Sequence, residues 1–224
     1  MRTQSGFSLI EMAIVLVIVT LLVGGLVAPL AAQLEARRIL ETERTLADAR
    51  DAVVGFSRTR GGVRHLPCPD TDSPPDGEEN RSVDGTCASP SGWLPWITLG
   101  VGDRDAWNHR LRYEVDPAFS NDEGFNEATP LTGNIEICDA SSCASPVPDI
   151  VYVLVSHGPN GLGATTLGGS QKPLPTSADE LANLDADGNY VSHERRAGDT
   201  PYDDMLTWVS LSQFFPRACP AGCL

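Results

Sequence analysis

The most constraining feature of the sequence is a long uncharged segment near its N-terminus. After Glu11 no charged residue occurs until Glu35, and the residues between them are mostly Val, Leu, Ile, Ala and Gly. A helix needs roughly 20 consecutive apolar residues to cross the hydrocarbon core of a bilayer. The segment therefore predicts a membrane-spanning helix, and the rest of the chain must fold outside the bilayer.

A carboxylate stands at the start of this apolar segment. Transfer of a charged side chain into lipid is costly, so an ionisable residue at the edge of a span is a functional candidate. The residues around it are Gly6-Phe7-Ser8-Leu9-Ile10-Glu11, preceded by a short leader that contains Arg2. This arrangement resembles the class III signal of type IV pilin-like proteins, which include the pseudopilins of type II secretion systems.

The resemblance implies a processing step and an assembly role. A prepilin peptidase and methyltransferase would cut after Gly6 and leave Phe7 as the methylated N-terminus. Glu11 would pair with the N-terminal amine of a neighbouring pilin or pseudopilin subunit, because in lipid each charge lowers the desolvation cost of the other. The alternative is an ordinary secretory signal peptide. Against it, the leader is short, Glu11 interrupts the apolar region, and no strong cleavage site follows.

We expect four parts in the chain. The resemblance implies a leader at residues 1–6 and a filament-core role for the apolar half of the helix, and charge patterning separates this membrane-spanning half at 7–34 from an amphipathic half at 35–62 and an exported globular domain at 63–224. In the amphipathic half, apolar residues recur at alternating spacings of three and four between Ile39 and Phe56. That period predicts a helical stripe that packs on a sheet.

Several segments of the exported part predict β-strands. Leu111–Val115 alternates apolar and polar residues, and the mostly apolar, β-branched run Asp149–Val155 predicts a central strand. A further short strand is expected within 133–138. The segments Asp105–Val115 and Asp203–Trp208 resemble the first-strand and last-strand motifs of the major type II pseudopilin. The resemblance implies a pilin-like α+β fold, in which a long N-terminal helix packs on a small antiparallel sheet.

Six cysteines all lie beyond the apolar segment. An even number of cysteines in loop-like settings suits disulfide bonds in an oxidising compartment. Fifteen pairings are possible, and we favour the three that join neighbours in the sequence: Cys68–Cys87, Cys138–Cys143 and Cys219–Cys223. A zinc site of His65 with Cys68 and Cys87 is the alternative for the first pair, but it lacks a fourth ligand.

One stretch predicts a cation site. Asp185, Asp187 and Asn189 place oxygen ligands at alternate positions, which suits calcium. The resembled pseudopilins carry a calcium site in the loop before the last strand, which implies that Asp203 or Asp204 contributes as well. The alternative is a solvated acidic turn in which one of these two aspartates caps the last strand. No other cofactor is expected.

Charge and motifs argue against other classes of function. The net charge of −14 opposes the wrapping of nucleic acid, although it leaves room for a local basic patch. No G-x-S-x-G motif surrounds any serine, and the four histidines lie in separate segments. The glycine-rich run Gly163–Gly168 is followed by Gly169-Ser170, so the lysine of a phosphate-binding loop is missing. We therefore do not expect an enzyme.

The sequence predicts a structural subunit, either a minor pilin or a pseudopilin. It would cross the bacterial inner membrane once with a cytoplasmic N-terminus and a periplasmic domain, and would then join a type IV pilus-like or type II secretion filament. Its partners would be other subunits, the peptidase, an inner-membrane assembly platform and membrane lipid. The alternative is a membrane-anchored periplasmic binding or enzymatic domain that does not polymerise.

Overall fold

The computed structural model describes residues 8–59, 63–133 and 135–223 of the 224-residue chain. The chain forms two compact units, one ending at Leu40 and the other beginning at Glu41. Helix α1 (Leu9–Thr59) contributes its N-terminal part to the first unit and its C-terminal part to the second. The four-part division expected from the sequence stays a prediction.

The first unit contains the apolar part of α1. Its described side chains are largely exposed; Ile14 and Leu22, for example, are 54% and 61% accessible. Among the residues that the structure describes, α1 is the one helix long and apolar enough to cross a membrane. Apolar surface of this extent is unfavourable in water and favourable in lipid. The predicted helix is therefore present, and its length and composition suit a membrane span.

The second unit is built on a four-stranded antiparallel sheet. Its strand order is β1 (Ser91–Trp93), β2 (Arg112–Val115), β4 (Ile150–Ser156) and β6 (Met205–Ser210). Strand β4 pairs with both β2 and β6, and all of its residues are buried. The apolar run that predicted a central strand therefore lies at the centre of the sheet. Its residues need not alternate between apolar and polar, because the strand is buried on both faces.

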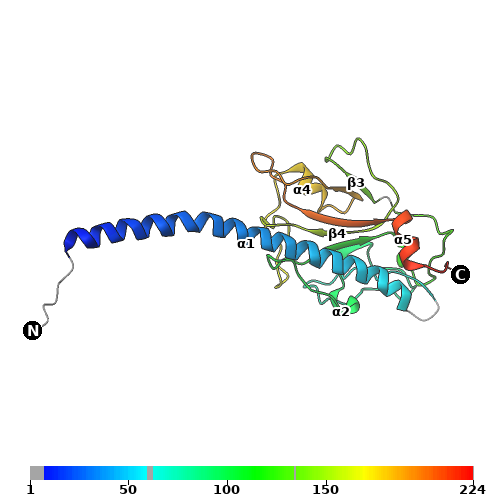
Figure 1. Cartoon of the computed structure of the whole chain (residues 1–224). Coiled ribbons are helices and arrows are strands. Elements are labelled where there is room, and N and C mark those ends of the chain that lie inside the picture. Colours follow the sequence, from blue (N-terminus) through cyan, green and yellow to red (C-terminus); the bar gives the residue numbers. More distant parts are fainter. Residues whose placement is uncertain (1–7, 60–62, 134, 224) are drawn as a thin grey trace, which may run out of the picture. The chain divides into compact units, whose positions relative to one another are not determined.

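The C-terminal part of α1 packs on this sheet (Figure 1). Its apolar positions follow spacings of three and four, so they share one face of the helix. Five side chains of the predicted stripe are buried: Thr42, Leu46, Ala49, Val53 and Phe56. The chain thus has the predicted α+β fold, with a long N-terminal helix on a small antiparallel sheet.

A second small sheet packs against the first. Strands β3 (Glu136–Cys138) and β5 (Asn189–Val191) pair in parallel, and Ile137 and Tyr190 join a core cluster with Val153 of β4. Tyr190 of β5 also donates a hydrogen bond of 2.5 Å to the carboxylate of Glu114. The sequence predicted β3 but not β5, because a three-residue strand carries little periodic pattern.

Short helices fill the connections of the second unit. They are α2 (Trp96–Leu99), α3 (Pro117–Ser120), α4 (Ala178–Ala182) and α5 (Leu211–Ala218). Helices α3 and α5 bring together four phenylalanine rings whose contacting centroids are 5.1 to 6.4 Å apart: Phe119, Phe125, Phe214 and Phe215. This aromatic cluster fixes the C-terminal helix, red in Figure 1, against the domain.

Three disulfide bonds close loops of the second unit: Cys68–Cys87, Cys138–Cys143 and Cys219–Cys223. They are the same three pairs that the sequence favoured. No cysteine is free among the described residues. The sulfur atoms of Cys68 and Cys87 are therefore engaged with each other, and the zinc alternative is left without its two thiolate ligands.

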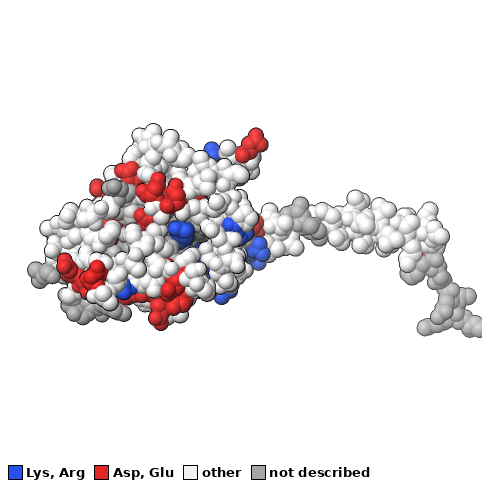
Figure 2. All heavy atoms as spheres, turned by 180° about the vertical axis from the view of Figure 1, so that it is seen from behind, with Lys and Arg blue, Asp and Glu red and all other residues white. Residues whose placement is uncertain are grey.

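The surface of the second unit is rich in acids. Figure 2 shows one face, on which Asp and Glu side chains gather in several clusters while Lys and Arg are fewer. This distribution agrees with the net charge of −14.

Candidate functional site

Ser8 and Glu11 together form the N-terminal cap of α1. The main-chain N–H of Ser8 donates a 2.8 Å hydrogen bond to Glu11 Oε2, and the N–H of Glu11 donates to Ser8 Oγ at 3.3 Å. This reciprocal pair is a capping box, which satisfies donors that the first helical turn leaves without partners. The carboxylate predicted to act in assembly is thus held at the helix start. Gly6 and Phe7 lie outside the described residues.

A second candidate site is a group of three acids at the end of the main sheet. Glu180 lies on α4, while Asp203 and Asp204 directly precede β6. One carboxylate oxygen of each lies within 4.8 Å of the others. Glu180 is 1% exposed and Asp204 5%. Negative charges that are this close and shielded from water repel one another strongly. The cluster therefore needs bound protons or a bound cation to offset this repulsion.

The turn after β4 fixes one oxygen of two of these acids. The main-chain N–H of Asn160 donates to Asp203 Oδ2 at 3.0 Å, and its Nδ2 donates to Glu180 Oε1 at 3.0 Å. The N–H of Asp203 donates to the same Glu180 oxygen at 3.1 Å. The other two oxygens, Glu180 Oε2 and Asp203 Oδ1, are buried and have no hydrogen-bond partner among the described residues.

The third acid is held differently. Asn183 Nδ2 donates to Asp204 Oδ2 at 2.8 Å, and Nδ1 of His157 lies 3.4 Å from Asp204 Oδ1. All these donors except the histidine are neutral amides, so they leave the negative charge of the cluster largely in place.

The pKa values of the cluster reflect this environment. Burial raises the pKa of Asp203 to about 6, and the charges of Glu180 and Asp204 act in the same direction. Burial, with the charge of Asp204, also raises the pKa of Glu180 above its ordinary value. Unpartnered buried carboxylate oxygens are the ligands that a hard divalent cation such as calcium prefers. The cluster therefore fits the calcium that the resemblance implied.

The acids that the structure brings together differ in part from the ligands expected from the sequence. Asp203 and Asp204 lie together, but their third acid is Glu180 rather than Asp185 or Asp187. The side chain of Asp185 accepts a hydrogen bond from the N–H of Asp187, and that of Asp187 accepts one from the N–H of Asn189. These contacts describe a hydrogen-bonded acidic turn. Sequence spacing could not reveal Glu180, because it approaches the aspartates only through the fold.

A second acidic group, Asp70, Asp72 and Asp76, has no such free oxygens. Asp70 is fully buried and accepts hydrogen bonds from the N–H groups of Asp72 and Gly77 at 2.9 and 2.6 Å. Asp72 accepts from the side chain of Asn80. Through these hydrogen bonds the acids hold a loop in its conformation.

The histidines form no nucleophilic triad in the described part of the chain. Ser156 Oγ donates to Asp105 Oδ2 at 2.8 Å, and Nδ1 of His109 lies 3.4 Å from the same oxygen. In a triad the imidazole lies between the hydroxyl and the acid and contacts both of them. Here the acid lies between them, and all three residues are buried. The group ties the 105–109 turn to the end of β4.

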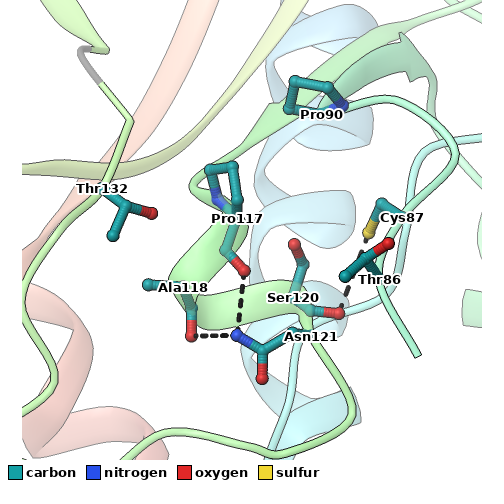
Figure 3. Close-up of a pocket in the computed structure, with 8 residues that line it drawn as sticks. All are labelled: Thr86, Cys87, Pro90, Pro117, Ala118, Ser120, Asn121 and Thr132. Atoms are coloured by element: carbon teal, nitrogen blue, oxygen red, sulfur yellow. Dashed lines mark hydrogen bonds between the residues drawn. The ribbon is translucent and has the colours of Figure 1, made fainter. Parts of the chain in front are cut away.

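A pocket of about 310 Å³ lies beside α3 (Figure 3). It is lined by Thr86, Cys87, Pro90, Pro117, Ala118, Ser120, Asn121 and Thr132. Asn121 Nδ2 donates to the carbonyls of Pro117 and Ala118, as the dashed lines show. The lining contains no acid, histidine or lysine, and its cysteine is in a disulfide bond. It offers a small, mostly apolar surface without acid–base groups.

Comparison with known proteins adds one finding. A family model described as the prokaryotic N-terminal methylation motif matches residues 1–27. No curated protein and no solved structure matches the chain. The matched region includes Gly6, Phe7 and Glu11 together with the first part of the apolar helix. The N-terminus of the chain therefore carries the cleavage and methylation signal of type IV pilins and pseudopilins.

Proposed function

We propose that this chain is a structural subunit that a prepilin peptidase processes and that assembles into a type IV pilus-like or type II secretion filament. The observation that carries the proposal is the methylation motif at residues 1–27, joined to a helix long enough to cross a membrane. The protein serves as building block and as substrate of the processing enzyme, with other subunits and an inner-membrane platform as its partners.

The proposed mechanism follows from the position of Glu11. In the single chain its carboxylate has Ser8 as hydrogen-bond partner. In the assembled filament the amine of a neighbouring Phe7 would take over as counter-charge. Both charges are expensive in lipid when alone and tolerable when paired, so subunits would join in the register that brings them together. The apolar part of α1 would form the filament core and the acidic domain would face solvent on the periplasmic side.

Mass spectrometry of the mature N-terminus, from native membranes, tests the proposal. A chain that begins with N-methylated Phe7 supports it. An intact Met1, or a start near Gln33, contradicts it and favours a domain that is merely anchored or secreted.

The competing function is a membrane-anchored binding or enzymatic domain that does not polymerise. The two functions differ in what Glu11 does. If the chain is a filament subunit, Glu11→Ala should be missing from filaments. If it is an anchored domain, Glu11→Ala should keep its full binding or enzymatic activity.

We also propose that the Glu180, Asp203 and Asp204 cluster binds calcium. The supporting observation is the pair of buried carboxylate oxygens without partners, Glu180 Oε2 and Asp203 Oδ1. Equilibrium dialysis of the detergent-solubilised full chain against calcium tests this. Binding of one ion per chain supports the site, and absence of binding at millimolar calcium removes it.

A further inference from the structure

The two edges of the main sheet differ in how the chain covers them. At the β1 edge, Trp93 and Asp70 exchange two main-chain hydrogen bonds of 2.8 and 2.9 Å, so a neighbouring segment pairs with that edge. At the opposite edge, β6 pairs with β4, and no further segment among the described residues bonds to its main chain. Every second residue of an edge strand directs its N–H and C=O outward. The outer edge of β6 therefore offers main-chain donors and acceptors to another chain.

The sequence of β6 does not block this edge. Proteins usually protect an open edge with charged residues, proline or a bulge in the edge strand. Met205–Ser210 contains no charged residue, no proline and no glycine. An irregularity in its pairing lies between Ile150 and Tyr152, on the β4 side. The edge of β6 is thus uncharged, which suits the addition of another strand.

A groove of about 380 Å³ lies beside the first half of this edge, where Met205–Thr207 line it. One wall is α1, which contributes Glu43, Ala47 and Arg50, and the other wall is the 192–195 loop. The three α1 residues are spaced by four and three, so they share one face of the helix. An extended strand directs alternate side chains to opposite faces. A strand beside β6 would therefore place one row of side chains on α1 and the other row on the loop.

We propose that the open edge of β6 accepts an extended segment of another protein as a fifth strand of the main sheet. The segment would run antiparallel to β6 and carry an acid, an apolar residue and a base at every second position. The acid would meet Arg50, the apolar residue Ala47 and the base Glu43. This inference goes beyond the proposed filament subunit, and it depends neither on filament assembly nor on a bound cation.

The α1 wall sets this charge pattern. Glu43 and Arg50 are seven residues apart, so they lie about 10 Å from each other along the helix. Two residues four positions apart in a strand are separated by about 13 Å, and long side chains cover the difference. Glu43 is exposed and forms no ion pair with the described residues, while Arg50 has an exposed contact of 3.4 Å with Asp51. Such exposed pairs are weak, so Arg50 can exchange its partner.

The direction of the segment follows from the course of β6. Met205–Thr207, at its start, share the groove with residues 43–50 of α1. Helix α5, which follows β6, lies farther along α1, because Nη1 of Arg217 is 3.5 Å from Asp51 Oδ1. Strand β6 and α1 thus run in the same direction (Figure 1). Antiparallel pairing is the pattern of this sheet and is slightly more stable per residue than parallel pairing. An antiparallel segment passes Arg50 before Glu43, so its acid precedes its base.

A second copy of this chain fits the edge less well. Two copies that each carry a net charge of −14 repel one another. The uncharged β6 of the second copy could not pair with Glu43 or Arg50 of the first. A segment that carries both an acid and a base complements the two charges of the α1 wall, and it is the occupant that we expect.

Binding of a designed peptide to the full chain in detergent micelles tests the proposal. The probe is Thr-Glu-Thr-Leu-Thr-Lys-Thr with an N-terminal fluorescein, and the matched control is the reversed sequence Thr-Lys-Thr-Leu-Thr-Glu-Thr. Because both peptides have the same composition, detergent takes up both equally. Fluorescence anisotropy should give the control a Kd about tenfold higher, since two exposed ion pairs become two contacts between like charges. Hydrogen exchange in residues 205–210 should slow when the probe binds.

Methylation of the main-chain nitrogens of the probe tests whether it pairs as a strand. Alternate amides of a strand point to opposite edges. One probe carries methyl groups on its second, fourth and sixth nitrogens, and another carries them on its third, fifth and seventh. One of the two should lose binding and the other should keep it. Equal binding of the two methylated probes would show that side chains alone hold the peptide, and would overturn the added strand.

A charge exchange on α1 tests the pattern of the segment. In the double variant Glu43→Lys with Arg50→Glu, the reversed peptide should become the tighter ligand. The bond from Tyr152 is kept, because it goes to the main-chain carbonyl of residue 50. The matched control is Arg44→Glu with Asp48→Lys, which exchanges two exposed charges of α1 outside the groove. It should keep the preference of the wild type, and both double variants leave the net charge unchanged.

The remaining outcomes also decide the proposal. Absence of binding by both peptides at millimolar concentration overturns it. Equal Kd values for the two peptides, or the same preference in both double variants, overturn the assigned pattern of acid and base. Sedimentation that shows dimers of the chain, with slowed hydrogen exchange in residues 205–210 before any peptide is added, would identify a second copy as the occupant and overturn the proposed partner. None of these results bears on the filament role or on calcium binding.

Discussion

The phenol of Tyr152 donates a 2.8 Å hydrogen bond to the main-chain carbonyl of Arg50. Tyr152 is fully buried in β4, the central strand of the main sheet, and Arg50 belongs to the part of α1 that packs on it. Apolar contacts such as those of Ala49 and Val53 are not directional. This hydrogen bond is directional, so it fixes the position of α1 along the sheet and its rotation about its own axis.

Tyr152→Phe should lower the free energy of unfolding by about 1 kcal/mol, since the ring stays and one buried hydrogen bond is lost. Hydrogen exchange should rise in residues 41–59 of α1. Tyr113→Phe is the matched control, because its equally buried phenol bonds to the carbonyl of Pro67 and not to α1. Equal exchange in α1 for the two variants would contradict the proposed role of Tyr152.

Removal of the Cys68–Cys87 bond should cost the most among the disulfides. Its cysteines are 19 residues apart, and the entropy of closing such a loop corresponds to about 3 kcal/mol. The four-residue separation of Cys219 and Cys223 corresponds to about 2 kcal/mol. Chemical unfolding of the two paired Cys→Ser variants measures the difference. Equal midpoints would show that loop length does not govern their contribution.

The sequence predicted the elements that carry a repeated pattern. The helix stripe from Thr42 to Phe56 has the period of three and four, and the run Asp149–Val155 is mostly apolar, so both could be recognised from the local sequence alone. Strand β5 and helix α5 were not predicted. The three residues of β5 and the helix-internal Pro216 of α5 give weak local signals, and tertiary packing decides their conformation.

Prediction of the candidate site residues was limited in the same way to those with a local sequence signal. Glu11 was identified from its neighbours, since a carboxylate beside an apolar run is unusual in any fold. Asp203 and Asp204 were identified through a resemblance, and their alternate-spaced companions Asp185 and Asp187 are placed elsewhere. Glu180 carries no sequence signal for the cluster, because it is 23 residues before Asp203 and meets it only through the fold.

Glu114 should make the stability depend on pH. Burial raises its pKa above the ordinary value of 4.5, although the hydrogen bond from Tyr190 acts against the shift. The folded state thus binds a proton more tightly than the unfolded state, so this group's stabilising contribution is greatest below pH 4.5 and is lost as pH rises through its raised pKa.

Glu114→Gln removes this titration and keeps an acceptor for Tyr190. The melting temperature of the variant relative to wild type should therefore be higher at pH 7.5 than at pH 4.5. Thermal unfolding at the two pH values measures it. A difference of the opposite sign would mean that ionised Glu114 is stabilised by its surroundings.

The capping box of Ser8 and Glu11 gives the last prediction. Glu11→Ala removes the acid that would pair with a neighbouring amine, so sheared filament fractions should lose the subunit while the N-terminus of the membrane form is still processed at Phe7. Ser8→Ala keeps the acid but removes the acceptor of the Glu11 N–H. It should reduce filament incorporation partly, because loss of a cap costs a helix about 1 kcal/mol. Ser8→Thr, which keeps the hydroxyl, should restore it. Wild-type amounts of Glu11→Ala in filaments would show that assembly does not use this carboxylate, and unprocessed Glu11→Ala would place its role in cleavage instead.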